Sequence, residues 1–272
     1  MFSMGLSLVP DDFRRVGRFP RALAAGFALQ VFSLPALAFA VGWVFTTWLG
    51  LQPVYAAGLI ILAACPGGVI SNMLTHLARG DTALSITLTA LISVLSVVTL
   101  PFVVNLGLAF FLGAGAVQLD VLKTVLGIFS LTTAPVAVGM LIKSFRPQLA
   151  DRLDPPVRKL AAVLFAGLVV GALVKDRDLL IDAIGTLGPA VLALNLGAMG
   201  VAYSVARMLA LPPAQNHALV FECGTQSAAL AMFIALNVLQ SDEMMAPCAV
   251  YSVVMFFTSV AALAGIRARE PG

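Results

Sequence analysis

The sequence predicts an all-α polytopic membrane protein with eight complete spans and a shorter apolar stub at its N-terminus. Apolar types make up 60% of the 272 residues and charged types only 11%, whereas a soluble domain carries about 25% charged residues. The apolar residues also form long continuous runs, and about 20 of them are enough to cross a hydrocarbon core as a helix. We expect helices because a lipid-facing barrel would show alternation with a period of two.

The predicted spans follow one another along the chain with short polar interruptions. Residues 1–9 are too short to cross a bilayer and lack the basic region and cleavage site of a signal peptide. We expect them to be the last turns of a helix whose start is absent from this chain. The eight complete spans are expected at residues 22–49, 54–77, 82–112, 121–142, 157–174, 185–210, 218–239 and 244–266.

The basic residues predict the orientation of these spans. The 16 Lys and Arg residues are concentrated in alternate loops, with clusters at residues 14–21 and 143–159 and with Arg267 and Arg269 near the C-terminus. Cytoplasmic loops are enriched in Lys and Arg, so we expect a multi-pass protein of the cell inner (plasma) membrane with a cytoplasmic C-terminus. This distribution accounts for the pI near 9.0. We therefore expect a lipid bilayer, and no nucleic acid, as the partner of the basic residues.

Two of the predicted spans are interrupted by residues that are unusual in a membrane helix. Each opens with a proline, Pro53 or Pro213, and is then broken at residues 65–68 (Cys-Pro-Gly-Gly) or 222–227 (Glu-Cys-Gly-Thr-Gln-Ser). Proline lacks a backbone N–H and glycine tolerates unwound backbone. The two spans lie five apart, so they run in opposite directions. Matched interruptions in two inverted halves indicate a transporter binding site; the alternative is kinks that serve packing alone.

Glu222 is the only ionisable residue deep within any predicted span. A carboxylate at that depth costs several kcal/mol unless it is compensated, so we expect it to coordinate a cation or relay a proton. The alternative is a structural pair with Arg or Lys. Oxygen-bearing side chains that suit a hard monovalent cation occur nearby in the chain, and interhelical hydrogen bonding is the other explanation for them. These residues are Ser71, Asn72, Ser85 and Thr89.

Four further residues within the spans are open to two interpretations. Gln30 is a candidate ligand or a packing residue, and Asn195 a packing residue or a substrate contact. Cys65 and Cys223 flank the interruptions, where they could bind soft metals or arsenite or be small buried apolar residues. The sequence has no hydrolase motif, zinc motif or nucleotide-binding loop, so we expect neither an enzyme nor a primary pump.

Three segments resemble the bile acid:sodium symporter family. The longest, in residues 65–89, reads C-P-G-G-x-x-S-N-x-x-T-x-x-x-x-G-D-x-x-L-S-x-x-x-T. Residues 4–8 with Asp12 and Phe13 resemble the early segment of the family, and residues 222–231 resemble its second crossover. The resemblance runs along essentially the whole chain.

The resemblance implies a single transmembrane transporter domain of two inverted repeats. Its core helices would lie roughly at residues 19–113 and 179–267, and those of an incomplete panel roughly at residues 1–18 and 114–178. It also implies two sodium ions at the crossing of the interrupted helices. The first site would contain Ser71, Asn72, Ser85, Thr89 and Glu222, and the second Gln30, Glu222, Gln226 and the backbone carbonyls of Cys223 and Thr225. Candidate substrate-binding residues are Val69, Ile70, Ser227 and Asn195.

Two departures from the family pattern concern the substrate. Val69 stands where Thr or Asn is frequent, and Ser227 stands where Asn is common, so a bile acid is not assumed. We expect sodium-coupled symport of small organic anions, bile-acid-like or carboxylate, by alternating access. Two alternatives stay open: a metalloid or proton-coupled efflux carrier on the same fold, and a non-transporting truncated homologue or membrane sensor.

Overall fold

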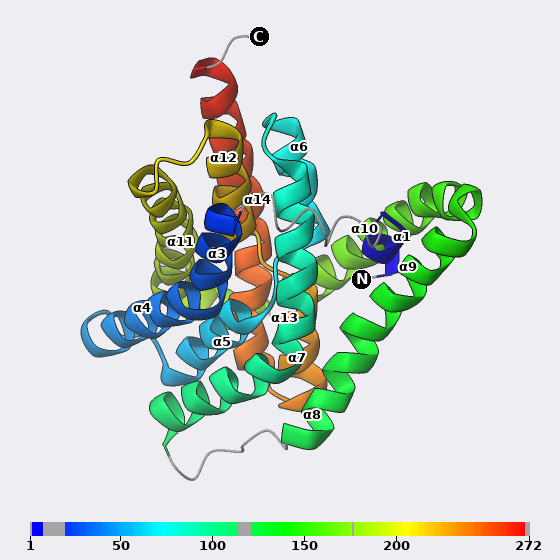
Figure 1. Ribbon diagram of the computed structural model, residues 1–272. Helices are drawn as coiled ribbons and strands as arrows, with labels where there is room; N and C mark the ends of the chain where they lie inside the picture. The colour runs from blue at the N-terminus through cyan, green and yellow to red at the C-terminus, as the bar shows by residue number, and fades with distance from the viewer. Residues whose placement is uncertain (1, 8–19, 114–120, 176, 270–272) are drawn as a thin grey trace.

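The computed structural model describes residues 2–7, 20–113, 121–175 and 177–269, and every element in these residues is a helix (Figure 1). This agrees with the predicted all-α class. In the described part four helices are long and apolar enough to cross a membrane. They are the continuous helix α3 (Pro20–Ala28), η2 (Leu29–Ser33) and α4 (Leu34–Trp48); α7 (Thr82–Leu112); Gly185–Met208 within α11 (Arg177–Met208); and Asp242–Ala268 within α14 (Asp242–Arg269).

Two of the other predicted spans, the second and the seventh, are divided into shorter helices. The second is split into α5 (Pro53–Ala64) and α6 (Val69–Leu77). The seventh is split into α12 (Pro213–Gly224) and α13 (Ala228–Phe233), which continues as η4 (Ile234–Val238). The count of eight spans and the inverted repeat stay predictions.

The centre of the molecule is built around α5, which is buried on all sides. Every residue from Tyr55 to Ala64 is buried, and α5 contacts α4, α7 and α14. A helix that is apolar all round is expected to lie inside a bundle. Close contact of the backbones depends on small residues: a side chain at Gly58 would meet the Met244 carbonyl, and one at Gly107 would meet Ile60.

Two wide helical turns precede prolines at the same spacing. η2 ends two residues before Pro35, and η3 (Phe129–Thr133) ends two residues before Pro135. Proline has no N–H for the carbonyl four residues earlier, and a π-type turn is one way to accommodate the lost bond. In η2 this turn carries Gln30, which is buried.

A second group of helices packs to one side of this centre. It consists of α1 (Phe2–Ser7), α9 (Ala134–Phe145) and α10 (Pro147–Lys175), which contact one another and lie on the right in Figure 1. α8 (Val121–Ile128) and η3 connect it to α7, and α10 reaches α11 and α14. We call α1, α9 and α10 the outer group. The division into core and panel stays a prediction, and residues 1, 8–18, 114–120 and 176 of the proposed panel lie outside the described residues.

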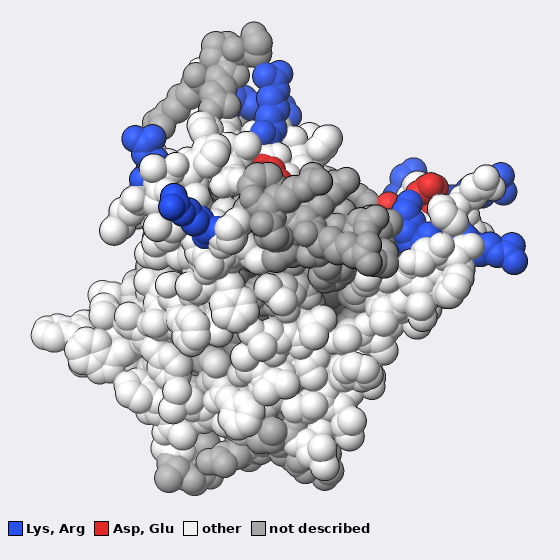
Figure 2. All heavy atoms as spheres, in the orientation of Figure 1, with Lys and Arg blue, Asp and Glu red and all other residues white. Residues whose placement is uncertain are grey.

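The charged residues are unevenly distributed over the surface. Figure 2 shows Lys and Arg at the upper end of the molecule and at its right-hand tip, while the described residues visible on the lower part of this face are of other types than Lys, Arg, Asp and Glu. In the same orientation, the C-terminal end of α14 lies at the top and the turn between α9 and α10 at the upper right. This agrees with the clustering of basic residues in alternate loops; which side of a membrane they face stays a prediction.

Candidate functional site

The two interruptions meet inside the molecule. Gly67, between α5 and α6, pairs with Gln226, between α12 and α13, as an isolated antiparallel bridge. The Ser227 N–H also donates to the Pro66 carbonyl at 2.9 Å. The unwound segments therefore satisfy part of each other's backbone hydrogen-bonding capacity, which is required of irregular backbone at membrane depth. We call these two segments, residues 65–68 and 225–227, the crossover.

Glu222 lies beside the crossover on α12 and is fully buried. Its Oε2 accepts hydrogen bonds from Ser71 Oγ at 2.7 Å and Ser85 Oγ at 3.1 Å. Its Oε1 accepts one from Thr89 Oγ1 at 2.6 Å. The carboxylate approaches the crossover this closely because residue 67 is glycine: a Cβ there would collide with the carboxylate.

The partners of this carboxylate are neutral. No basic side chain of the described residues forms an ion pair with Glu222. Burial of an ionised carboxylate is costly, and hydroxyl donors offset only part of that cost. The interpretation of Glu222 as a structural pair with Arg or Lys therefore finds no support in the described part of the chain.

The first predicted set of ligands forms one cluster of oxygen atoms. Asn72 Oδ1 lies 2.7 Å from Ser85 Oγ and 3.4 Å from Thr89 Oγ1, and both hydroxyls also contact Glu222. Ser85 and Thr89 share a face of α7 because they are four residues apart, and Asp81 caps the first turn of α7 by accepting from the Leu84 N–H at 3.0 Å. Such all-oxygen groups suit hard cations rather than soft ones.

The second predicted set is also brought together, around the last turn of α12. Gln30 Nε2 donates to the Glu222 carbonyl at 2.9 Å, and Gln226 Nε2 donates to the Cys223 carbonyl at 3.0 Å. Gln226 Oε1 is buried without a partner. If the two side-chain amides turned, their oxygens would face the same carbonyls, and all four oxygens would then be available to a cation. Thr225 Oγ1 instead donates to the Phe221 carbonyl at 2.5 Å.

The predicted substrate residues occupy different surroundings. Ile70 lines a groove of about 400 Å³ between α6, α10 and α14, next to Thr225. Ser227 is partly buried and immediately precedes α13. Asn195 is fully buried and donates to the Gly224 carbonyl at 2.8 Å, so it holds the end of α12. The side chain of Val69 lies outside the described part of the structure.

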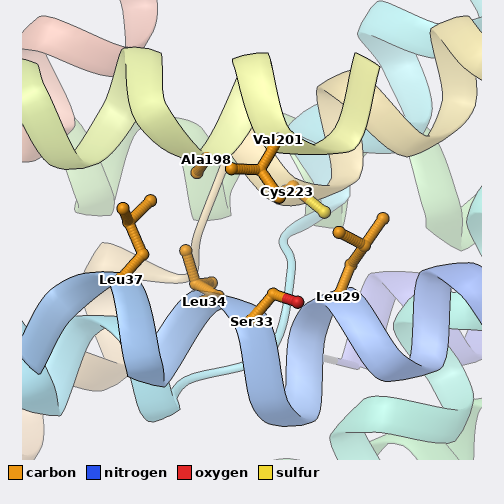
Figure 3. A pocket seen from close by; sticks show the side chains of 7 residues that line it. All are labelled: Leu29, Ser33, Leu34, Leu37, Ala198, Val201 and Cys223. Carbon is orange, nitrogen blue, oxygen red and sulfur yellow. The ribbon is translucent and has the colours of Figure 1, made fainter. Parts of the chain in front are cut away.

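The cysteines lie at the edges of the site. Cys65 and Cys223 are buried. Figure 3 shows the Cys223 sulfur in a small pocket between η2–α4 and α11, with Ser33 and the side chains of Leu29, Leu34, Leu37, Ala198 and Val201. In the described residues there is no group of three or more His, Cys, Asp or Glu side chains that could hold a metal ion.

Two residues near the site were not among the predicted ligands or substrate contacts, although Thr75 belongs to the family motif in residues 65–89. Thr75 Oγ1 lies 3.4 Å from Ser85 Oγ, and its position four residues after Ser71 on α6 is the signal that could have identified it. Tyr251 donates to the Gly224 carbonyl at 3.0 Å from α14. No local pattern marks this tyrosine, since its partner is 27 residues away along the chain.

Comparison with known proteins identifies the family. The family model described as the Sodium Bile acid symporter family matches residues 1–183. The chain belongs to this family. The predicted resemblance is thus confirmed, and the family is one of symporters.

Sequence identity to individual relatives supports this family assignment. The chain is 30% identical over 93% of its length to the probable sodium/metabolite cotransporter BASS1, chloroplastic, of Arabidopsis thaliana, covering 61% of that protein. It is 29% identical over 94% of its length to BASS2 of Oryza sativa subsp. japonica, covering 59%. It is 29% identical over 86% of its length to the uncharacterized sodium-dependent transporter YocS of Bacillus subtilis (strain 168), covering 70%. The chain thus spans about three fifths of the plant relatives.

Proposed function

We propose that this protein is a sodium-coupled carrier that moves small organic anions by alternating access. The observation that carries this proposal is the buried carboxylate of Glu222, which is surrounded by oxygen atoms and has no basic partner in the described residues. A bound cation would supply the missing charge compensation. The names of the relatives, sodium/metabolite cotransporter and sodium-dependent transporter, support sodium as that cation.

Two sodium ions are proposed, as coupled cargo of the carrier. The first would be held by the oxygen cluster of α6, α7 and α12, and the second by Gln30, Gln226 and the carbonyls at the end of α12. Glu222 belongs to both sets, through its carboxylate and its backbone carbonyl. This shared residue gives a physical reason for the two ions to bind together.

The anion would bind where the groove meets the crossover. The groove reaches Ile70 in the first turn of α6 and Thr225 in the crossover. The positive end of a half-helix and a nearby bound cation both favour a negatively charged group. Movement of the outer group against the centre would then expose the groove to each side of the inner membrane in turn, within a fold of two inverted repeats whose C-terminus is cytoplasmic.

Uptake into proteoliposomes tests this function. With an inward sodium gradient, the protein should accumulate radiolabelled organic carboxylates, and a potassium or proton gradient should not replace sodium. Glu222→Ala should reduce sodium-dependent uptake at least about a hundredfold, because the loss of a buried ligand charge costs several kcal/mol. Glu243→Gln, at an exposed site on α14, is the matched control and should transport normally.

Three outcomes of the uptake experiment would contradict the proposed function. Sodium-dependent uptake that persists in Glu222→Ala would refute the role of this residue. Uptake that follows a proton gradient alone would favour the proton-coupled alternative. No uptake of any anion by the parent protein would favour a protein that does not transport.

A further inference from the structure

The last three carbonyls of α12 accept hydrogen bonds from different parts of the molecule. A helix leaves its final carbonyls without partners inside the helix. The Glu222 carbonyl accepts from Gln30 Nε2 at 2.9 Å and from Gln226 Nε2 at 3.3 Å. The Cys223 carbonyl accepts from Gln226 Nε2 at 3.0 Å. Both carbonyls belong to the second proposed cation set, and the side-chain amides bonded to them would have to turn to admit an ion.

The Gly224 carbonyl is held instead by two neighbouring helices. It accepts from Asn195 Nδ2 of α11 at 2.8 Å and from the Tyr251 hydroxyl of α14 at 3.0 Å. The same amide of Asn195 also donates to the Tyr251 oxygen at 3.1 Å, which closes the network. Both side chains are buried, and α11, α12 and α14 contact one another (Figure 1). We call Asn195, Tyr251 and the Gly224 carbonyl the α12 clamp.

The α12 clamp fixes the direction of the backbone where α12 ends. A carbonyl oxygen has two lone pairs, and the two donors occupy both of them at Gly224. This carbonyl is therefore not available to a cation. The end of α12 also lies directly against α11, since a Cβ at residue 224 would lie 2.5 Å from Met199 Cγ. The two preceding carbonyls thus extend from a segment that is held on two sides.

Asn195 is costly for the stability of the protein. Its Oδ1 is buried and has no hydrogen-bond partner in the described structure. A buried polar atom without a partner is unfavourable, and a leucine of similar shape would avoid this cost. Residues that serve a functional site often lower stability. The asparagine is therefore explained better by the carbonyl that it holds than by a contribution to stability.

We propose that Asn195 and Tyr251 are positioning residues of the second cation site. They hold the unwound end of α12 by the Gly224 carbonyl, so that the two preceding carbonyls keep their direction when the bonded amides turn toward the ion. Ligands that are fixed in advance bind more tightly, because less conformational freedom is lost on binding. Neither residue is itself a ligand. This inference rests on the proposed function, since it concerns how one of the two sodium sites is held in shape.

A connection that serves packing alone is the alternative. It would stabilise the protein with or without sodium, and its loss would weaken both cation sets alike. A positioning role predicts a different result, because only the second set depends on the carbonyls at the end of α12. The two explanations are separated by measuring the same substitution in different backgrounds.

Calorimetric sodium titration of Tyr251→Phe tests the proposal. This change removes one donor to the Gly224 carbonyl and keeps the ring, so sodium affinity should fall about fivefold, as expected for one hydrogen bond. In a Gln226→Leu background, where the second set is already incomplete, Tyr251→Phe should cause no further fall. In a Thr89→Val background, which alters the first set, the fivefold fall should persist. Tyr203→Phe, exposed on α11, is the control and should bind sodium as the parent protein does.

Asn195→Leu provides an independent variant. Its sodium affinity should also fall about fivefold, whereas its midpoint of thermal unfolding in potassium should be no lower than that of the parent protein, because the partnerless oxygen is gone. Unchanged sodium affinity in either variant would overturn the proposal. So would an equal fall for Tyr251→Phe in all three backgrounds, or a lower midpoint for Asn195→Leu, because each is the result expected from packing alone.

The parent protein separates this inference from the function on which it rests. If the parent and both variants bind sodium equally well, the positioning role is wrong and sodium coupling stands. If the background-dependent fall is observed but sodium does not drive uptake of any anion, the positioning role stands and the carrier function fails. If the parent protein shows no saturable sodium binding, both are wrong.

Discussion

Buried, paired polar atoms are concentrated at and beside the crossover, whereas the outer group exposes apolar side chains. At the crossover, polar atoms from α5–α6, α7 and α12–α13 are buried and paired across long stretches of chain: Ser71 and Glu222 are 151 residues apart. In the outer group, apolar side chains such as Val163, Leu164 and Val170 are more than half exposed. Large exposed apolar surfaces suit a lipid environment. The difference supports the proposal that ions bind at the interior crossing, and that the outer group faces lipid and is the part that moves.

Addition of a methyl group at Gly67 in the crossover should have the largest effect on the response to sodium. In Gly67→Ala the new Cβ would collide with the Glu222 carboxylate, so we expect the response to sodium to be lost. Overpacking of this kind also lowers the free energy of unfolding by about 1–3 kcal/mol. Gly167→Ala, on α10 with open space around the position, should change neither quantity. Thermal unfolding of both variants in sodium and in potassium provides the measurement.

Removal of one hydroxyl from the oxygen cluster should have the next largest effect. Thr89→Val keeps the shape of the side chain but removes the donor to Glu222 Oε1. We expect the affinity for sodium to fall about tenfold. Ser130→Ala in η3, where the hydroxyl is exposed and bonded to Leu126, should bind sodium normally. Equal sodium affinities of the two variants would argue against the cluster as a cation site.

The residues of the crossover could be predicted from the sequence, because they are chemically conspicuous. A glutamate and a Pro-Gly-Gly segment are rare within apolar runs, and together they indicate a site without knowledge of the fold; hydroxyls four residues apart add to this indication only beside them. The antiparallel bridge between Gly67 and Gln226 could not be predicted in this way. Local patterns indicate that two segments are irregular, but the contact between them is set by the packing of α5, α7 and α14.

Two other structural features, the π-type turn of η2 and the start of α10, could not be predicted from the sequence. Pro35 shows that one carbonyl loses its donor, but not that a π-type turn forms and directs Gln30 inward. α10 begins at Pro147, ten residues before the predicted span, with Pro155 and Pro156 inside it. The sequence favoured a loop there because these residues are polar and basic and lie between two apolar runs, and the helix nevertheless continues through this proline pair.

The outer group can be disturbed separately from the crossover. A Cβ in Gly139→Ala would meet the backbone of Gly5 where α1 packs on α9. Thermal stability should fall by about 1–3 kcal/mol, but the increase in stability that sodium produces should be unchanged. Gly127→Ala on α8, which has open space, should leave both unchanged. Loss of the sodium effect in Gly139→Ala would show that the two regions are not independent.

The smallest effect is expected at the connection between α14 and α6. The guanidinium of Arg267 donates to the Leu77 carbonyl at 3.0 and 3.3 Å, which stabilises the C-terminal end of the half-helix that carries Ser71. In Arg267→Gln we expect sodium affinity to fall about two- to threefold, since a cation at a helix C-terminus contributes about 0.3–1 kcal/mol. Arg207→Gln, at the exposed end of α11, is the control for loss of charge, and sodium titrations compare the two.

The central claim is that the buried carboxylate of Glu222 binds sodium, and calorimetric titration of the purified protein tests it most directly. The account predicts a saturable heat with sodium, none with potassium, and no saturable sodium binding in Glu222→Gln, which keeps the size of the side chain and removes its charge. Sodium binding of unchanged affinity in Glu222→Gln, or equal binding of potassium by the parent protein, would contradict it.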